Sequence, residues 1–326
     1  MKIVVTGASG FIGMNLCKYL NDQGHQVRAI IRSEQKEKFF KEISITTRIG
    51  DVRDFETLKV AFKDADVIMH LAALFNRPKA SWEEYRSVNI DGTRNVMEAA
   101  ISEKVKLVIH CSTVGVAIGN GEMPFSEKTP YSPPAWDKYE TSKCEGEKLA
   151  LEYHDKQGLS VIVLRPSQVY GPGDRSKAKF YRLVKKGVII NPGKTMKHLI
   201  YIDDLCRAFE LAAKATDIGG ETFIIGEEEA ISLRSLITVV AKELDVNTPK
   251  VYLPATPVTW LCTSVEKMCN LVGVAPPVFR RSMDFFTRSV EFNVSKARDR
   301  LGFKSEVDVE TGVSRTAKWY IHNGLV

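Results

Sequence analysis

The chain has 326 residues, of which 44% are hydrophobic and 26% are charged, a composition that is ordinary for a globular protein. The 46 Lys and Arg residues against 40 Asp and Glu give a net charge of +6 without long basic blocks, so the sequence gives no sign of a nucleic-acid partner. The six cysteines form neither a CxxC pair nor a zinc-type cluster, which predicts reduced thiols, no metal site and a cytoplasmic location.

The chain begins with an apolar run at residues 3–5, a turn that contains Gly7, Gly10 and Gly13, and then apolar positions at helical spacing. Glycines at such a junction let the backbone approach a diphosphate, and the helix N-terminus supplies free N–H groups and a positive dipole end. The GxxGxxG spacing differs from the GxGxxG fingerprint, and a turn that only packs the helix against the sheet is the alternative. Because the turn follows the first strand, we expect it to hold a nucleotide.

The alternation of strands and helices continues through the first half of the chain. Apolar runs that predict buried strands are separated by amphipathic stretches that predict helices. This order is typical of an α/β fold with a Rossmann-type, doubly wound parallel sheet. The further strands are expected within residues 24–31, 44–54, 64–73 and 105–113.

Proline and glycine punctuate shorter elements in the second half. We therefore expect a dinucleotide-binding Rossmann domain over residues 1–170 and a smaller, mixed, mainly substrate-binding region over residues 171–326, with some segments returning to the Rossmann sheet. The apolar stretch 254–273 contains Glu266 and Lys267, which argues against an integral membrane helix. A buried helix or a lid is expected there, and a helix resting on a membrane surface is the alternative.

A tyrosine and a lysine stand four residues apart in the segment WDKYETSKCEGEK. Helical spacing would place Tyr139 and Lys143 on the same face, about one turn apart. A solvated helix surface is the alternative interpretation of such a pair.

Together these elements resemble the extended short-chain dehydrogenase/reductases of the NAD-dependent epimerase/dehydratase family, and look like its hydroxysteroid dehydrogenase and dihydroflavonol reductase branches. The resemblance covers most of the chain. It also implies a homodimer, because many relatives pair the helices that begin near Asn89 and Tyr139. The matching segments are the glycine turn, GDVRD from Gly50, MHLAA from Met69, NIDGTRNVMEAA from Asn89, YETSK from Tyr139, LRPSQVYGPGD from Leu164 and YIDDLCRAF from Tyr201.

The resemblance implies that Tyr139 is the catalytic acid and base. A free phenol has a pKa of about 10, so it is a poor base at neutral pH. A lysine ammonium one turn away and an oxidised nicotinamide both favour the phenolate and lower this pKa. Lys143 is then the catalytic lysine, and by resemblance it also holds the nicotinamide ribose.

A hydroxyl that hydrogen-bonds the substrate oxygen is the third catalytic group that the resemblance implies. Ser112 and Thr113 both stand at the end of the strand expected within residues 105–113. Successive strand residues point to opposite faces, so only one of the two can face the nicotinamide. Counting back from Tyr139 through Glu127 and Pro124 favours Thr113 as the catalytic hydroxyl, and Ser112 remains the alternative, with the other residue a packing or supporting one.

The end of the second strand carries the cofactor preference. NAD enzymes usually place an acidic residue where this chain has Ile31, followed here by Arg32 and later by Lys36. A guanidinium at this point can pair with a 2′-phosphate, which favours NADP, with NAD as the alternative. The resemblance assigns the cofactor to Gly7, Ser9, Gly10, Phe11, Ile12, Gly13, Arg32, Lys36, Asp51, Val52, Leu71, Ala72, Ala73, Tyr139, Lys143, Pro166 and Val169.

Some polar residues have two interpretations. Asn89 is either a hydrogen-bonding residue near the site or a helix N-cap. Arg175, after the GPGD turn, is a candidate for a substrate or cofactor phosphate, and a solvated loop is the alternative. Three histidines without carboxylate or cysteine partners at metal spacing are expected in the core or at its edge: His70, His110 and His198.

The residues predict an NADP-dependent oxidoreductase that transfers hydride at a secondary alcohol or ketone of a fairly bulky small molecule. The apolar segment 256–273 is a candidate wall of its pocket. A nucleotide-sugar epimerase, which oxidises and re-reduces one carbon with bound NAD, is the alternative. A cofactor-sensing protein without turnover is a third possibility, disfavoured because Tyr139 and Lys143 are both present.

Overall fold

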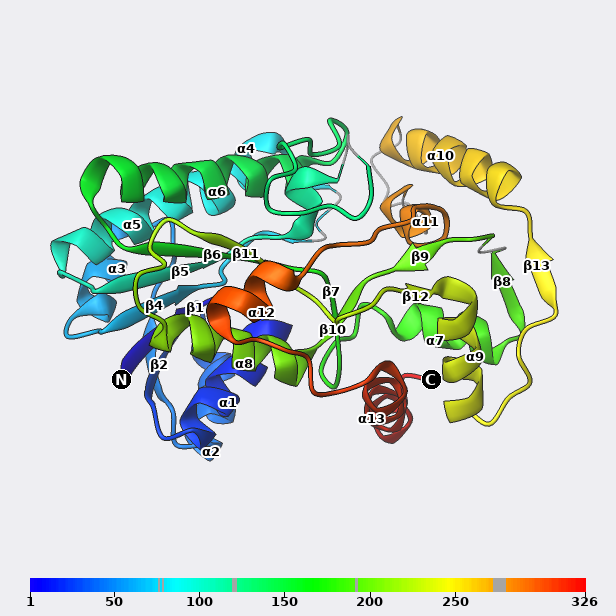
Figure 1. The fold of residues 1–326 in the computed structure, drawn as a ribbon, viewed down its shortest axis with the longest axis horizontal. Coiled ribbons are helices and arrows are strands. Elements are labelled where there is room, and N and C mark those ends of the chain that lie inside the picture. Colours follow the sequence, from blue (N-terminus) through cyan, green and yellow to red (C-terminus); the bar gives the residue numbers. More distant parts are fainter. Residues whose placement is uncertain (76, 78, 119–121, 191–192, 272–279) are drawn as a thin grey trace. The chain divides into compact units, whose positions relative to one another are not determined.

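The computed structural model describes residues 1–75, 77, 79–118, 122–190, 193–271 and 280–326 (Figure 1). The chain divides into two compact units. The first unit consists of Met1–Ser167, Ile202–Gly226 and Asn293–Lys304, and the second consists of Gln168–Tyr201, Glu227–Phe292 and Ser305–Val326.

A seven-stranded sheet forms the centre of the first unit, in the order β11-β6-β5-β4-β1-β2-β3. Every neighbouring pair is parallel, so the predicted doubly wound α/β fold is confirmed. The order reverses between β1 and β4, which in open parallel sheets is where ligands bind beyond the carboxyl ends of the strands. The strands are β1 (Lys2–Thr6), β2 (Gln26–Ile31), β3 (Thr46–Ile49), β4 (Val67–His70), β5 (Leu107–Cys111), β6 (Val161–Pro166) and β11 (Thr222–Ile225).

Helices cover both faces of this sheet (Figure 1). Helices α3, α5 and α6 pack side by side on one face, and α1 packs with α8 on the other. The helices of the first unit are α1 (Phe11–Asp22), α2 (Glu37–Glu42), α3 (Phe55–Phe62), α4 (Trp82–Arg86), α5 (Gly92–Ser102), α6 (Lys138–Gln157), α8 (Ile202–Lys214) and α12 (Ser295–Leu301), with short 3₁₀ turns at Glu34–Lys36 and Val114–Ala117 and a π-helical segment at Ser87–Asp91.

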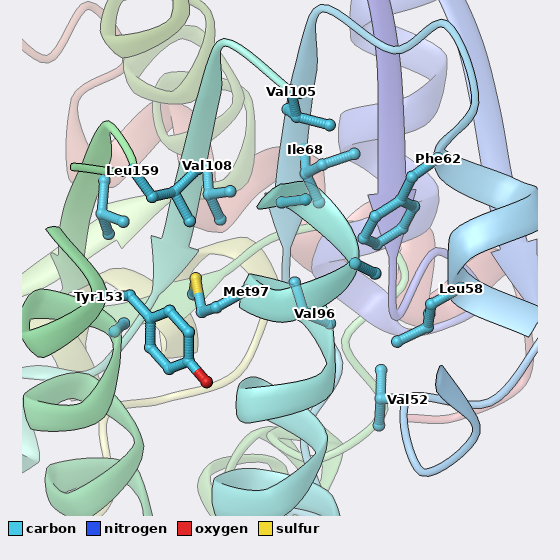
Figure 2. Packing of buried hydrophobic residues seen from close by; sticks show 14 of the residues in the cluster. Val52, Leu58, Phe62, Ile68, Val96, Met97, Val105, Val108, Tyr153 and Leu159 are labelled. Atoms are coloured by element: carbon cyan, nitrogen blue, oxygen red, sulfur yellow. The ribbon is translucent and has the colours of Figure 1, made fainter. Parts of the chain in front are cut away.

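The apolar core between α3, α5, α6 and the sheet follows from the two periodicities in the sequence. Alternate strand residues such as Ile68 and Val108 face this side of the sheet, and apolar residues at helical spacing meet them. Figure 2 shows Val96 and Met97 of α5 between Phe62 on one side and Tyr153 on the other. This core holds α3, α5 and α6 against the sheet.

The second unit contains small two-stranded sheets of mixed direction. Strands β7 and β10 are parallel, β8 and β13 are parallel, and β9 and β12 are antiparallel. Its strands are β7 (Gln168–Tyr170), β8 (Val188–Ile190), β9 (Met196–Lys197), β10 (Leu199–Tyr201), β12 (Ile231–Ser232) and β13 (Val251–Leu253). Its helices are α7 (Ala178–Lys185), α9 (Leu233–Glu243), α10 (Ala255–Leu271), α11 (Arg280–Thr287) and α13 (Val309–His322).

Helix α10 forms where the apolar stretch predicts a helix. The expectation that this helix is buried is wrong for three of its large side chains. Trp260 is 74% exposed, and Leu261 and Met268 are also exposed. Within the described ranges, no helix is both long and apolar enough to cross a membrane.

Replacing two residues of α3 should have very different effects on the stability of the protein. Phe62 is fully buried in the cluster, whereas Val60, two residues earlier, is 70% exposed. Phe62→Ala should lower the free energy of unfolding by about 3–5 kcal/mol, because it removes buried apolar surface and leaves a cavity. Val60→Ala should change it by less than about 0.5 kcal/mol. Urea unfolding of both variants measures this, and equal losses would contradict the packing described.

Candidate active site

The glycine turn between β1 and α1 packs too tightly for side chains at two of its three glycines. Gly7 has a φ of +70°, and a Cβ there would lie 2.6 Å from the Ala72 nitrogen. A Cβ on Gly13 would lie 2.3 Å from the Gly7 oxygen. At Gly10, by contrast, a Cβ would meet only the Gly7 oxygen, at 3.3 Å. The first and third glycines therefore serve packing, and Gly10 is the least crowded of the three.

The N-terminus of α1 has the donors that a diphosphate needs. Its N-cap, Gly10, has no side chain that could accept hydrogen bonds from the first N–H groups of the helix. The first turn contains no acidic residue. The unsatisfied N–H groups and the positive end of the helix dipole favour an anion there. These residues fit a dinucleotide, and the partly exposed Ser9, Phe11 and Ile12 lie on the same turn.

Cationic side chains gather at the carboxyl ends of β2 and β3. Arg32 and Lys36 are exposed after the buried Ile31. Asp51, after β3, accepts hydrogen bonds from Arg53 Nε at 3.0 Å and Nη2 at 2.7 Å. These bonds lower the pKa of the Asp51 carboxyl, and the charge of Arg32 acts in the same direction. Arg53 was missed in the sequence, although it stands two residues after Asp51 in the GDVRD segment.

The segment after β4 is held by a buried amide. The Leu71 and Ala72 N–H groups donate to the Thr6 carbonyl and hydroxyl, and Asn89 pairs with both backbone groups of Leu74. The Leu74 N–H donates to Asn89 Oδ1 at 2.7 Å, and Asn89 Nδ2 donates to the Leu74 carbonyl at 3.2 Å. Ala73 lies between these anchored residues.

Asn89 lies within the π-helical segment, and the N-cap interpretation is wrong, since the helix already begins at Trp82. Its Nδ2 also donates to Ser142 Oγ at 2.8 Å, and Ser142 Oγ donates to the Tyr139 carbonyl at 2.8 Å. One buried side chain therefore ties the segment after β4 to the first turn of α6.

Helix α6 carries the tyrosine and lysine at the predicted spacing. Asp137 caps it by accepting the N–H of Tyr139 at 3.0 Å and that of Glu140 at 3.3 Å. Tyr139 is half-buried, and its ring packs against Phe75 with centroids 4.9 Å apart and planes at 70°. The tyrosine therefore stands at the capped start of the helix with part of its surface accessible.

Lys143 is only 3% exposed, one turn further along α6. Its Nζ donates to the Cys111 carbonyl at 2.7 Å and lies 3.5 Å from His110 Nε2. Burial lowers the pKa of Lys143, and Cys111, Glu147 and Glu140 oppose this effect. A positive charge in such a poorly hydrated place acts more strongly on its neighbours than one in water.

The two adjacent hydroxyls at the end of β5 have different environments. Ser112 is buried, and its Oγ donates to Glu147 in a short hydrogen bond. Thr113 is half-buried, and its Oγ1 accepts the Gly115 N–H at 3.1 Å. Accepting this bond leaves the Thr113 hydroxyl hydrogen available for donation.

Glu147 joins several segments around this site. It is fully buried and accepts hydrogen bonds from Arg165 Nε at 3.0 Å, from Arg165 Nη2 at 2.5 Å and from the Tyr131 hydroxyl at 2.8 Å, besides that from Ser112. The carboxylate thus ties α6 to β5, β6 and the loop before the helix. This cluster was missed in the sequence, although Glu147 lies one turn after Lys143.

Three further candidates follow, end or lie within strands β3, β6 and β7, respectively, and a fourth, Arg175, lies in the loop after β7. Pro166 ends β6, where it pairs with Ile225, and the next hydroxyl, Ser167 Oγ, is buried without a hydrogen-bond partner among the described residues. Asn95 Nδ2 donates to the carbonyl of the buried Val52 at 2.9 Å. In the second unit, Val169 accepts a hydrogen bond from Lys177, and Arg175 is exposed.

The histidines occupy buried positions, as expected. His70, His110 and His198 are each at most 1% exposed. Burial lowers the pKa of His70 to about 3 and that of His110 well below its usual value, so both are neutral. No group of three or more His, Cys, Asp or Glu residues in the described ranges is arranged to hold a metal ion.

Known proteins match this chain over nearly its whole length. It is 29% identical to a 3beta-hydroxysteroid-dehydrogenase/decarboxylase (isoform 1) of Arabidopsis thaliana, covering 98% of the chain and 79% of that protein. It is 25% identical to a UDP-glucose 4-epimerase of Vibrio cholerae, covering 98% and 95%. The solved UDP-glucuronic acid 4-epimerase of Bacillus cereus in complex with NAD superimposes with a TM-score of 0.79 at 26% identity, covering 99% of both chains.

A family model, the NAD dependent epimerase/dehydratase family, matches residues 3–226. This span contains the glycine turn, the Tyr139–Lys143 pair and the seven-stranded sheet except for Lys2, the first residue of β1. The chain therefore belongs to the NAD-dependent epimerase/dehydratase family, the enzymes of the extended short-chain dehydrogenase/reductase type that bind NAD(P).

Proposed function

We propose that this enzyme oxidises a secondary alcohol, or reduces the corresponding ketone, with Tyr139, Lys143 and Thr113 as its catalytic residues. The observation that carries the proposal is the arrangement on α6: an accessible Tyr139 at the capped start of the helix and a buried Lys143 one turn later. The dehydrogenase named among the relatives supports this reaction.

Each of the three residues has one part in the proposed reaction. The Thr113 hydroxyl, oriented by the Gly115 N–H, donates a hydrogen bond to the substrate oxygen. Tyr139 takes the hydroxyl proton during oxidation and returns it during reduction. The Lys143 ammonium, held by the Cys111 carbonyl, stabilises the phenolate form of Tyr139. A bound nicotinamide supplies the acceptor or donor of the hydride.

The geometry of the first unit supports a proposal for the cofactor residues. The glycine turn and the start of α1 would hold the diphosphate, and the segments after β3 and β4 would hold the adenosine and nicotinamide ends. Arg32 and Lys36, exposed beyond the buried Ile31, favour NADP, because they can pair with a 2′-phosphate. NAD remains the alternative, since NAD is present in the solved relative.

A nucleotide-sugar epimerase is the second candidate function. The similarity to the Vibrio cholerae and Bacillus cereus epimerases supports it. Tyr139 would then take and return the proton of one sugar hydroxyl, and a nicotinamide that stays bound would accept the hydride of that carbon and return it to the opposite face. Such an enzyme should purify with its nicotinamide, whereas a reductase should exchange it.

Tyr139→Phe tests the proposed reaction directly. Wild-type protein should reduce added NADP or NAD in the presence of a secondary alcohol, measured as absorbance of the reduced nicotinamide. The variant should lose about 10²–10⁴-fold in kcat, because the proton acceptor is gone. Turnover of UDP-glucose with tightly bound nicotinamide, and none of any alcohol, would instead favour the epimerase. Unchanged turnover in Tyr139→Phe would falsify the assignment of this residue.

Thr113→Ala and Ser112→Ala should have different effects. Thr113→Ala should lower kcat by about 10²–10³-fold with little loss of stability, because it removes a donor to the reacting oxygen. Ser112→Ala should mainly lower the free energy of unfolding, by about 1–3 kcal/mol, because it leaves Glu147 with one bond fewer in a buried place. Steady-state kinetics and urea unfolding of the two variants measure the contrast. The reverse pattern would make Ser112 the catalytic hydroxyl.

Arg32→Ala should reduce the preference for NADP. Loss of one charge-assisted bond to a 2′-phosphate should lower kcat/KM for NADP by about 10–100-fold and leave that for NAD nearly unchanged. Lys38→Ala is the matched control, because it removes another exposed cation from the segment between β2 and β3. An equal decrease for both cofactors in Arg32→Ala would contradict the assignment.

A further inference from the structure

A buried carboxylate lies in the first turn of α6, next to the proposed catalytic tyrosine. Glu140 follows Tyr139 directly, and only 8% of its surface is exposed. Its backbone N–H donates to the Asp137 cap at 3.3 Å, so the residue is fixed in the first helical turn. Glu140 also stands three residues before Lys143, a spacing that places two side chains on the same side of a helix. The acidic side chain is therefore next to the tyrosine in the chain and on the lysine side of the helix.

The carboxyl group of Glu140 packs directly against the turn after β5. A Cβ on Gly115 would overlap the carboxyl carbon and both carboxyl oxygens of Glu140. The Gly115 N–H donates to Thr113 Oγ1 at 3.1 Å, so the residue that orients the proposed catalytic hydroxyl also touches this carboxyl group. Since any side chain at position 115 would displace the carboxyl group, the glycine fixes the place of its charge.

The uncharged groups around Lys143 come from β4 and β5. Burial lowers the pKa of His70 to about 3 and that of His110 well below its usual value, so both rings are neutral. Burial also raises the pKa of the Cys111 thiol to about 11, so the thiol carries no charge at neutral pH. None of these three side chains can therefore balance the charge of the ammonium group.

The charged groups around Lys143 come from α6 and β6. Burial lowers the pKa of Lys143, whereas the carboxylates Glu147 and Glu140 raise it. Glu147 also accepts hydrogen bonds from Arg165 Nε, at 3.0 Å and 3.2 Å to its two oxygens, so the guanidinium offsets much of its negative charge. The charge of Glu140 acts in a poorly hydrated place, where charges interact more strongly than in water. Glu140 is consequently a separate source of the negative charge that favours a protonated Lys143.

We propose that the buried carboxylate of Glu140 keeps Lys143 protonated and thereby sets the pH range in which Tyr139 can exchange a proton. Glu140 is thus a positioning residue, which acts through the lysine and the tyrosine. The inference rests on the catalytic roles proposed for these two residues. Removing one negative charge favours the deprotonated form of every group nearby, so the pKa values of Tyr139 and Lys143 should both fall without it.

The direct test is the titration of Tyr139 in the full-length protein. Wild type and Glu140→Gln, labelled with carbon-13 at the tyrosine ζ carbon, are titrated by NMR, and Tyr139→Phe identifies the resonance. Glutamine keeps the size of the side chain against Gly115 and removes its charge, so the pKa of Tyr139 should fall by about one unit. Glu145→Gln is the matched control, because it removes the same charge from an exposed position of α6 and should leave this pKa unchanged. A Tyr139 pKa that is equal or higher in Glu140→Gln overturns the inference, as does a phenol that stays neutral throughout in both proteins.

The pH dependence of turnover separates this role from a purely structural one. With cyclohexanol as the probe and NADP or NAD as the cofactor, kcat of Glu140→Gln should reach half of its maximum at a pH about one unit lower than in the wild type. Glu140→Asp keeps the charge and shortens the side chain, so it should lower kcat and leave the pH of half-maximal kcat close to that of the wild type. A lower kcat in both variants at an unchanged pH would show that Glu140 only supports the fold, and the inference would be wrong.

Failure of the proposed function has a different signature. If the wild type does not oxidise cyclohexanol or any other secondary alcohol, the oxidoreductase proposal fails, while the titration of Tyr139 still decides the inference. If Glu140→Gln does not fold, Gly115→Ala takes its place in the titration, because the added methyl group displaces the carboxyl group of Glu140. A Tyr139 pKa that Gly115→Ala leaves unchanged overturns the inference, and one that it lowers supports it.

Discussion

The buried charge of Lys143 is the constraint on which the candidate site depends. An ammonium group that is almost without contact to water is costly unless its hydrogens are bonded and acidic groups lie nearby. Here the Cys111 carbonyl accepts one hydrogen at 2.7 Å, and Glu140 and Glu147 act electrostatically in favour of the charge. The bond joins α6 to the end of β5, so the position of Tyr139 relative to Thr113 follows from it.

Two further buried groups extend this arrangement to the surrounding segments. Asn89 ties the segment after β4 to the first turn of α6, and Glu147 ties α6 to β5, β6 and Tyr131. Polar groups with several satisfied bonds in a poorly hydrated interior specify one arrangement of the elements they join. The catalytic candidates are consequently held by the interior of the first unit, while their working surfaces remain partly accessible.

The two ends of the expected dinucleotide site differ in character. Near Tyr139 the exposed side chains include the aromatic Phe75 and Trp136 and the cationic Lys138, whereas the ends of β2 and β3 carry Arg32, Lys36 and Arg53.

The sequence by itself determined the α/β fold, the strands β1 to β5, the glycine turn and the helix with Tyr139 and Lys143, because these depend on local periodicity and spacing. Only the tertiary structure brought β11 beside β6, tied Asn89 to Leu74 and Ser142, and exposed Trp260. It also separated the environments of Ser112 and Thr113 by burying one against Glu147. Each of these depends on contacts between residues distant in the chain or on the packing of a whole face, and no local pattern encodes such contacts.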